Sequence, residues 1–256
     1  MNAFFLKNIR PYFNFPGLSL PTALNSGLYL DEKIAAMKQN LSAEVTDYLA
    51  RYPQTKHIDV YLNDINGIMR GKRLSVESML NLEKGCYFPL SVYSMDQKGK
   101  IAASLHDEPD RLCVPVPGSL CPSPQAPEHN AQILLTMNDS DGKSCPLEPR
   151  VILQNVLARF HQHGLFPVIA PEIEFYLTGS DSQDPQNQGC FHMDTSTAHA
   201  ALFDELEQLA QHQHIPLTGI VAEAEPGQYE LNLKHSHRVI EVCDNVLALR
   251  RLTRYV

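Results

Sequence analysis

Two glutamates lie two residues apart in the segment APEIEFYL, residues 170–177, which otherwise has the composition of a buried β-strand. Side chains at that spacing point to the same face of a sheet, so Glu172 and Glu174 are predicted to be neighbours. Two neighbouring carboxylates repel each other unless the face is solvated or a cation lies between them. The pair therefore suggests a cation site, with a solvated surface as the simpler interpretation.

More acids follow on two further predicted strands. Glu223 and Glu225 lie in PLTGIVAEAEPG, and Glu230 lies in GQYELNLKH, where Gln228 and Asn232 share its face by parity. Acids on one face of three neighbouring strands would concentrate negative charge, and Mg²⁺ or Mn²⁺ would be the natural counter-ions because both prefer oxygen ligands. Carboxylate sites that hold more than one such ion usually perform phosphoryl chemistry. A single strand glutamate is more often a solvated surface residue than a ligand, so both interpretations stay open on these residues alone.

Other chemistry-bearing residues carry weaker signals. Three H-x-H pairs occur, and two of them lie at predicted helix C-termini, where imidazole suits the helix dipole. The pairs are His161/His163, His212/His214 and His235/His237. The sequence has no Gly-rich phosphate loop and no G-x-S-x-G motif. Its six cysteines are scattered without a C-x-x-C, which predicts reduced thiols and not a disulfide framework or a zinc site.

Composition limits the class of protein. The chain has 256 residues, of which 43% are apolar and 20% charged, a profile typical of soluble globular proteins. The net charge is −8 and no stretch is dominated by Lys or Arg, which argues against nucleic acid or an anionic membrane as partner. No apolar run approaches the roughly 18 residues that a membrane span requires. The N-terminus lacks the pattern of a secretory signal, so the expected location is cytoplasmic.

The elements that would position these acids fall into two regions. In the first region, apolar residues recur every three or four residues over 31–51, and this spacing predicts a helix. Alternation on both sides of Asn66-Gly67 then predicts a β-hairpin with Asp64 near its bend. A helical turn and three strands complete a small α+β domain over residues 31–143, after an N-terminal extension over 1–30. These elements are expected at residues 76–83, 86–93, 111–116 and 131–137.

The second region, residues 148–256, begins with a helix from Pro149 to about Gly164. The strand with Glu172 and Glu174 follows, then a helix near 196–213, the two other acidic strands and a final helix from residue 239. An apolar stripe along that last helix continues to Val256 without a cap, so the chain is expected to end inside an element and to need a partner surface there.

Several of these motifs together resemble the glutamine synthetase superfamily. They are VYLNDINGIMRGKRL, EPR before a helix, PEIEFYL and AEAEPGQYELNL. LEKGCYFPLSVYSMD, EPDRLCVPVPGSL, LLTMND and HGLFPVIAPEIEFYL are most similar to the γ-glutamylputrescine synthetase branch. The resemblance covers roughly residues 31–256.

The resemblance implies an N-terminal β-grasp domain followed by part of a catalytic domain with a curved antiparallel sheet and helices. It also implies active sites that lie between the subunits of a homo-oligomeric ring. The implied reaction is an ATP-dependent ligation that uses Mg²⁺ or Mn²⁺. The γ-carboxylate of glutamate is phosphorylated, and a small amine, either putrescine or a related polyamine or ammonia, then displaces the phosphate.

The same resemblance implies roles for five residues. Glu172 matches a ligand of the second metal ion, and Glu174, Glu223 and Glu230 match the ligands of the first. Asp64 matches an acid that reaches into the neighbouring subunit's site and helps to deprotonate the amine. No residue is assigned to the nucleotide.

The family pattern continues for about as long again beyond this sequence, so the chain is expected to be roughly the N-terminal half of a ligase, completed by a C-terminal half. Two alternatives remain. One is a truncated, non-catalytic paralogue that assembles with a full-length ligase or regulates it. The other sets the resemblance aside and takes the same acids as the site of a small metal-dependent phosphohydrolase.

Overall fold

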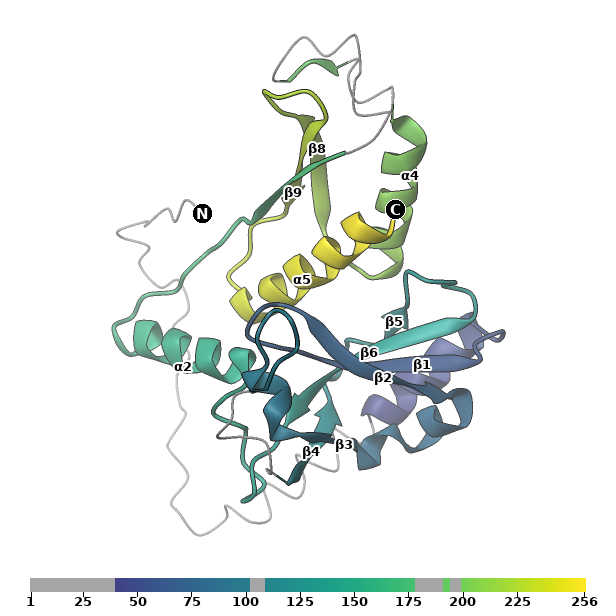
Figure 1. The fold of residues 1–256 in the computed structure, drawn as a ribbon, viewed down its shortest axis with the longest axis vertical. Helices are drawn as coiled ribbons and strands as arrows, with labels where there is room; N and C mark the ends of the chain where they lie inside the picture. Colours follow the sequence, from purple (N-terminus) through teal and green to yellow (C-terminus); the bar gives the residue numbers. More distant parts are fainter. Residues whose placement is uncertain (1–39, 102–108, 178–190, 194–198) are drawn as a thin grey trace, which may run out of the picture. The chain divides into compact units, whose positions relative to one another are not determined.

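The computed structural model describes residues 40–101, 109–177, 191–193 and 199–256, and these form two compact units (Figure 1). The N-terminal unit contains the described residues up to 120 together with 128–148. The C-terminal unit contains residues 121–127, which include the short strand β5 (Cys121–Pro122), and the described residues from 149 onward. The predicted extension over residues 1–30 lies outside the described residues.

The N-terminal unit is built on a mixed sheet with the strand order β2-β1-β6-β4-β3. Strands β1 and β6 are parallel, and the other neighbours in this order are antiparallel. The strands are β1 (His57–Asn63), β2 (Met69–Ser75), β3 (Cys86–Pro89), β4 (Asp110–Pro115) and β6 (Asn130–Met137).

One face of this sheet is buried by a helix over residues 40–51 and by the 3-10 helix η1 (Val76–Lys84). Ile58, Val60 and Leu62, which alternate along β1, are completely buried there. This alternation is the pattern that predicted the hairpin, and the antiparallel pairing of β1 with β2 confirms it.

The predicted strand over 86–93 is only half right. Strand β3 ends at Pro89, and the chain continues as the 3-10 helix η2 (Leu90–Ser94). Proline has no backbone N–H to give to a sheet ladder, so it ends the strand pairing at this point.

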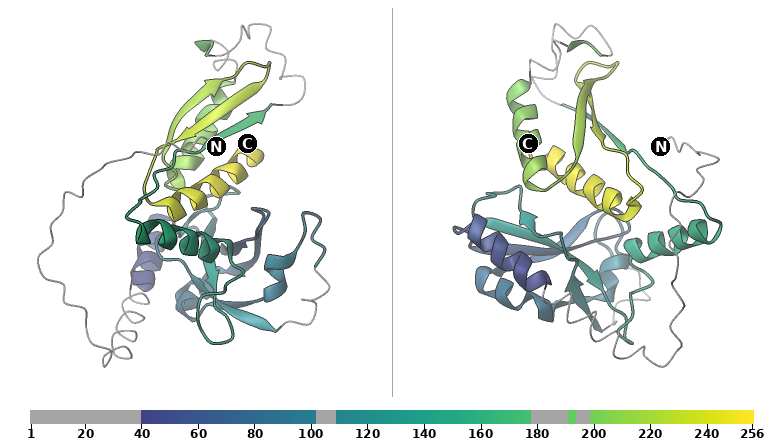
Figure 2. Two further views of the ribbon diagram at one scale, coloured as in Figure 1. Left: turned by 90° about the vertical axis from the view of Figure 1, so that its left-hand side faces the viewer. Right: turned by 180° about the vertical axis from the view of Figure 1, so that it is seen from behind.

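The C-terminal unit has an antiparallel sheet in the order β7-β9-β8. Its strands are β7 (Glu172–Tyr176), β8 (Leu217–Ala222) and β9 (Gln228–Leu233). Helices α4 (Ala200–His212) and α5 (Val239–Tyr255) pack against this sheet (Figures 1 and 2). These elements confirm the predicted order of strand, helix, two strands and helix.

The apolar stripe of α5 is covered within the chain. Leu249 and Leu252 are completely buried in a cluster that also contains Leu206 of α4 and Leu231 of β9. The expectation that this stripe needs a surface from elsewhere was therefore wrong, because α4 and the sheet supply it.

Helix α2 (Pro149–Gln162) behaves differently. None of its residues is buried, and Ile152 and Val156 are each 42% exposed. An ion pair between Arg150 and Asp244 links it to α5. None of the helices among the described residues combines the length and apolarity that a bilayer crossing demands.

Candidate functional site

The glutamates of β7 and β9 share one face of the C-terminal sheet. The pairing register sets Glu174 opposite Glu230, and Glu172 opposite Asn232. Ile173 and Phe175 alternate with the acids and turn toward the apolar cluster beneath α4 and α5. The acids therefore lie on the other face, where Glu172 and Glu174 are exposed.

Glu223 reaches the same face from β8. Val221 lies opposite Glu230, and Glu223 is two residues further along. Its backbone N–H donates to the carbonyl of Gln228 at 2.9 Å, which extends the pairing of the two strands by one step. The structure thus brings all four predicted metal ligands to one face of one sheet. Their role as ligands stays a prediction.

Glu225 is placed differently, in the turn between β8 and β9. Its carbonyl accepts the backbone N–H of Gln228 at 3.0 Å, and its own N–H donates to the side-chain oxygen of Gln228 at 3.4 Å. The side-chain amide of Gln228 in turn donates to Oε2 of Glu174 at 2.9 Å. Gln228 therefore connects the turn to one of the candidate ligands.

Burial and like charge act together on this face of the sheet. Burial raises the pKa of Glu230, and the neighbouring carboxylates Glu172, Glu223 and Glu174 raise it further, while a hydrogen bond with Asn232 acts in the opposite direction. Neighbouring carboxylates that act on Glu230 in this way favour a bound cation, because a cation offsets their charge. The donor set is entirely oxygen, which suits Mg²⁺ or Mn²⁺.

The carboxylates share a face without converging on one point. Within residues 40–101, 109–177, 191–193 and 199–256, no three His, Cys, Asp or Glu side chains are arranged so that they could hold a metal ion. The donor chemistry fits a hard divalent cation, and binding would require the side chains to turn toward a common centre.

Asp64 lies in the N-terminal unit, in the loop between β1 and β2. Its Oδ1 accepts the backbone N–H groups of Asn66 at 2.8 Å and Ile68 at 2.9 Å. Its Oδ2 accepts Nε–H of Arg70 at 2.9 Å. The side chain of Asp64 is 0% exposed and that of Arg70 is 24% exposed.

Sequence reasoning placed Asp64 near the bend but missed Arg70. The signal was present in the order Asp64, Asn66, Gly67, Arg70, which joins an Asp-initiated turn to a cation on the returning strand. Gly67 has φ 68°, a left-handed conformation that glycine adopts without strain, and this lets the chain reverse here.

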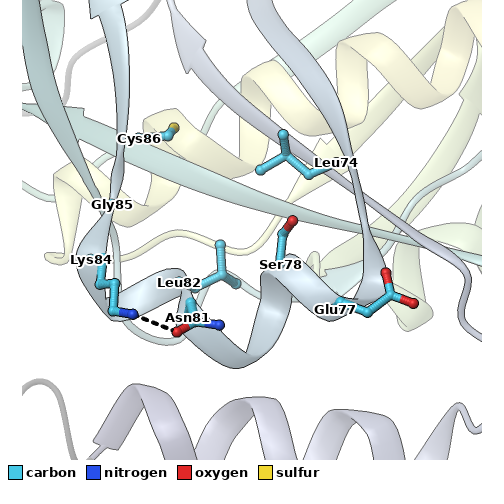
Figure 3. Close-up of a pocket in the computed structure, with 8 residues that line it drawn as sticks. All are labelled: Leu74, Glu77, Ser78, Asn81, Leu82, Lys84, Gly85 and Cys86. Atoms are coloured by element: carbon cyan, nitrogen blue, oxygen red, sulfur yellow. Dashed lines mark hydrogen bonds between the residues drawn. The ribbon is translucent and has the colours of Figure 1, made fainter.

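A hollow of about 370 Å³ lies in the N-terminal unit between β2, η1 and the start of β3 (Figure 3). Its lining residues are Leu74, Glu77, Ser78, Asn81, Leu82, Lys84, Gly85 and Cys86, which include none of the predicted site residues. Burial raises the pKa of the Cys86 thiol, so the thiol stays protonated near neutral pH and is a poor nucleophile. Cys86 and the other described cysteines are free thiols, as predicted.

Comparison with known proteins defines the family. Residues 146–256 match the model of the glutamine synthetase catalytic domain. The chain is 47% identical over 232 residues to γ-glutamylputrescine synthetase PuuA of Escherichia coli (strain K12), covering 82% of this chain and 49% of that protein. It is 25% identical over 192 residues to a glutamate–isopropylamine ligase of a Pseudomonas species, covering 67% of this chain and 42% of the relative.

A solved structure, a crystal structure described as a novel glutamine synthase homolog, supports the same fold. It superimposes with a TM-score of 0.67 at 23% identity, over 79% of this chain and 48% of its own. Residues 146–256 therefore belong to the glutamine synthetase catalytic-domain family, which confirms the resemblance seen in the motifs. The chain spans about half the length of the curated relatives it matches.

Proposed function

We propose that this chain provides part of the active site of an ATP-dependent ligase that joins the γ-carboxylate of glutamate to a small amine. The observation that carries the proposal is the set of four glutamates on one face of the β7-β9-β8 sheet. That arrangement occurs in a chain 47% identical to a γ-glutamylputrescine synthetase. The same likeness favours putrescine or a related polyamine over ammonia as the acceptor.

In this proposal Glu174, Glu223 and Glu230 hold one divalent cation, and Glu172 contributes to a second. Bound Mg²⁺ or Mn²⁺ supplies positive charge that offsets the charge on the ATP phosphates and on the transferred phosphoryl group. The side-chain amide of Gln228 donates to Oε2 of Glu174, and the other oxygen of Glu174 could still turn toward a cation. The pKa of Glu230 is raised by burial and also by the neighbouring carboxylates, whose charge a cation would offset.

The N-terminal unit has a separate part in the proposal. Its mixed sheet is the β-grasp domain, with the domain boundaries expected at 31–143 and 148–256, and its β1–β2 loop with Asp64 contributes to the site of a neighbouring subunit in a ring. The partners are then further copies of the chain and a complementing C-terminal half, together with glutamate and the amine. The protein would act in the cytoplasm.

The test is a complementation assay. The chain is mixed with the part of the E. coli relative that the alignment leaves uncovered, and phosphate release is measured with ATP, Mg²⁺, glutamate and putrescine. Amine-dependent release should appear in the mixture and not with the chain alone. It should fall by about 10²-fold or more in Glu174→Ala, because a lost electrostatic contact to the transferred group commonly costs that much.

Glu225→Ala is the control, since it removes an acid from the neighbouring turn between β8 and β9 at a position outside the ligand set. Equal loss in both variants would contradict the proposal. Amine-independent phosphate release by the chain alone would instead favour a phosphohydrolase. Assembly with the full-length relative that changes its rate, without complementation, would favour a regulatory paralogue.

A further inference from the structure

Helix α2 carries a wide apolar face. Ile152, Val156 and Phe160 recur every four residues, and Leu153 and Leu157 lie beside the first two. At about 100° per residue these five side chains fall within an arc of about 140°, which is the width of a helix face that packs on a core. The face is therefore built to be covered by another element.

The described parts of the chain do not cover it. No residue of α2 is buried, and none of the five apolar residues belongs to the clusters that the described residues form. Helices α4 and α5, by contrast, bury Leu206 and Leu249 in a cluster that they share. An ion pair between Arg150 and Asp244 joins α2 to α5, and α2 lies beside the beginning of α5, away from the strands of the sheet (Figures 1 and 2).

The exposed apolar surface continues past the end of α2. Leu165, Phe166 and Val168, in the segment that leads to β7, are exposed as well. Helix α2 has 14 residues, and helices shorter than about 12–15 residues are marginal in water unless their apolar face packs on another element. Both observations call for a second surface over α2.

The length of the relatives points to the source of that surface. Helix α2 lies inside residues 146–256, which match the glutamine synthetase catalytic domain, and the chain covers 49% of the E. coli relative. About half of such a ligase is thus available to cover the helix. A second copy of α2 is a poorer fit, because the helix contains Arg150, Arg159 and His161 but no Asp or Glu, so two such faces would bring like charges together.

We infer that the apolar face of α2 is the docking surface for the complementing half of the proposed ligase. The inference rests on the proposed function for the identity of the partner. It adds the place of contact, which is the first helix of the catalytic domain and not the stripe of α5, because the chain already covers that stripe.

The test uses the full chain, tagged and co-expressed with the part of the E. coli relative that the alignment leaves uncovered. The measurement is the amount of that part retained per chain after purification and dilution. The double substitution Ile152→Gln with Val156→Gln should reduce the retained amount by about tenfold or more, because it removes two apolar side chains from the contact. Both residues are exposed in the chain, and glutamine is a good helix former, so circular dichroism should show an unchanged fold.

Two controls separate this face from exposed surface in general. Ala158→Gln changes an exposed position of the same helix outside the apolar face, and Leu80→Gln removes an exposed leucine from η1 in the other unit. Each should retain the partner within about twofold of the wild-type amount. Equal retention by the double variant and the wild-type chain would overturn the inference, and so would the absence of any complex with the wild-type chain.

Hydrogen exchange gives a readout that needs no substitution. In the chain alone the amides of α2 should exchange faster than those of α5, and in the complex their exchange should slow by about tenfold or more. Unchanged exchange in α2 on complex formation would contradict the inference. Sedimentation of the chain alone tests the other occupant, since a dimer that the double substitution dissociates would show that a second copy covers α2.

The docking surface and the proposed function can fail separately. A complex that depends on Ile152 and Val156 but releases no phosphate in response to the amine would leave the docking surface standing and contradict the ligase. Amine-dependent release that the double substitution leaves unchanged would support the ligase and overturn the docking surface.

Discussion

Asp64 and Glu230 are both carboxylates positioned by β-hairpins, yet their surroundings are opposite. Asp64 meets three hydrogen-bond donors within its own hairpin, including the guanidinium of Arg70. Glu230 lies among the carboxylates of Glu172, Glu174 and Glu223, which raise its pKa in addition to the effect of burial.

The two carboxylates differ in the source of the positive charge that offsets their own negative charge. The fold itself supplies it to Asp64, within six residues of sequence, so this site is complete once the hairpin forms. On the β7-β9-β8 face the fold gathers negative charge, and a cation from solution would lower its free energy. The first arrangement stabilises structure, and the second suits the binding of a metal ion.

The largest expected effect is on the stability of the N-terminal unit. Asp64→Ala removes three hydrogen bonds and leaves Arg70 without its counter-charge, which should cost about 2–3 kcal/mol of unfolding free energy. Urea unfolding followed by circular dichroism measures it. Asp59→Ala should cost less than about 1 kcal/mol, because the pair of Asp59 with Arg73 is more exposed. If the two substitutions lowered the unfolding free energy equally, Asp64 would contribute no more to stability than Asp59 does in its more exposed ion pair.

The next effect is on cation affinity. Mn²⁺ should bind the full chain in the micromolar-to-millimolar range, and Glu174→Gln or Glu230→Gln should each weaken binding by about tenfold, or 1.4 kcal/mol, through loss of one charged ligand. Titration followed by the electron paramagnetic resonance of free Mn²⁺ measures this. Glu225→Gln should change the affinity by less than about twofold. Equal weakening in all three variants would reduce the site to nonspecific charge.

The smallest effect is on the pH dependence of stability. Because the pKa of Glu230 is raised in the folded state, the folded protein holds this proton to a higher pH than the unfolded chain. Its contribution to stability is therefore most favourable at acid pH and declines as pH rises from the unfolded value near 4.5 through the folded pKa.

Glu230→Gln removes that decline. The variant should gain Tm relative to wild type at pH 7, and the gain should shrink at pH 4.5, where wild-type Glu230 is protonated more fully. Differential scanning calorimetry at the two pH values measures the difference. A gain that is independent of pH would mean that neither burial nor the like charges on this face raise the pKa of Glu230. Mn²⁺ at saturation should also reduce the gain, if the cation binds there.

Helices α2 and α5 show what helical periodicity in a sequence can predict and what it cannot. Both carry apolar residues at helical spacing, and the sequence predicts both helices. Leu249 of α5 is completely buried, whereas Val156 of α2 is 42% exposed. Periodicity defines which side of a helix is apolar, and it carries no information about what covers that side.

The sequence by itself determined the local features of this protein. Alternation around Asn66-Gly67 predicted the hairpin that holds Asp64, and parity predicted which glutamates share a face. The family also followed from the sequence, because its motifs are local strings in a fixed order. These features depend on interactions between residues that are close in the chain, or on the two-residue period of a strand.

Only the tertiary structure decided how each acid is compensated. The register of β7 on β9 sets Glu174 opposite Glu230, although the two are far apart in sequence. The return of β2 beside β1 brings Arg70 to Asp64 and buries this carboxylate, for which the family resemblance implied a role in deprotonating the amine. The physical reason is that the charge state and reach of a carboxylate depend on the donors, acids and solvent around it in space, and strand pairing and burial determine which of these it meets.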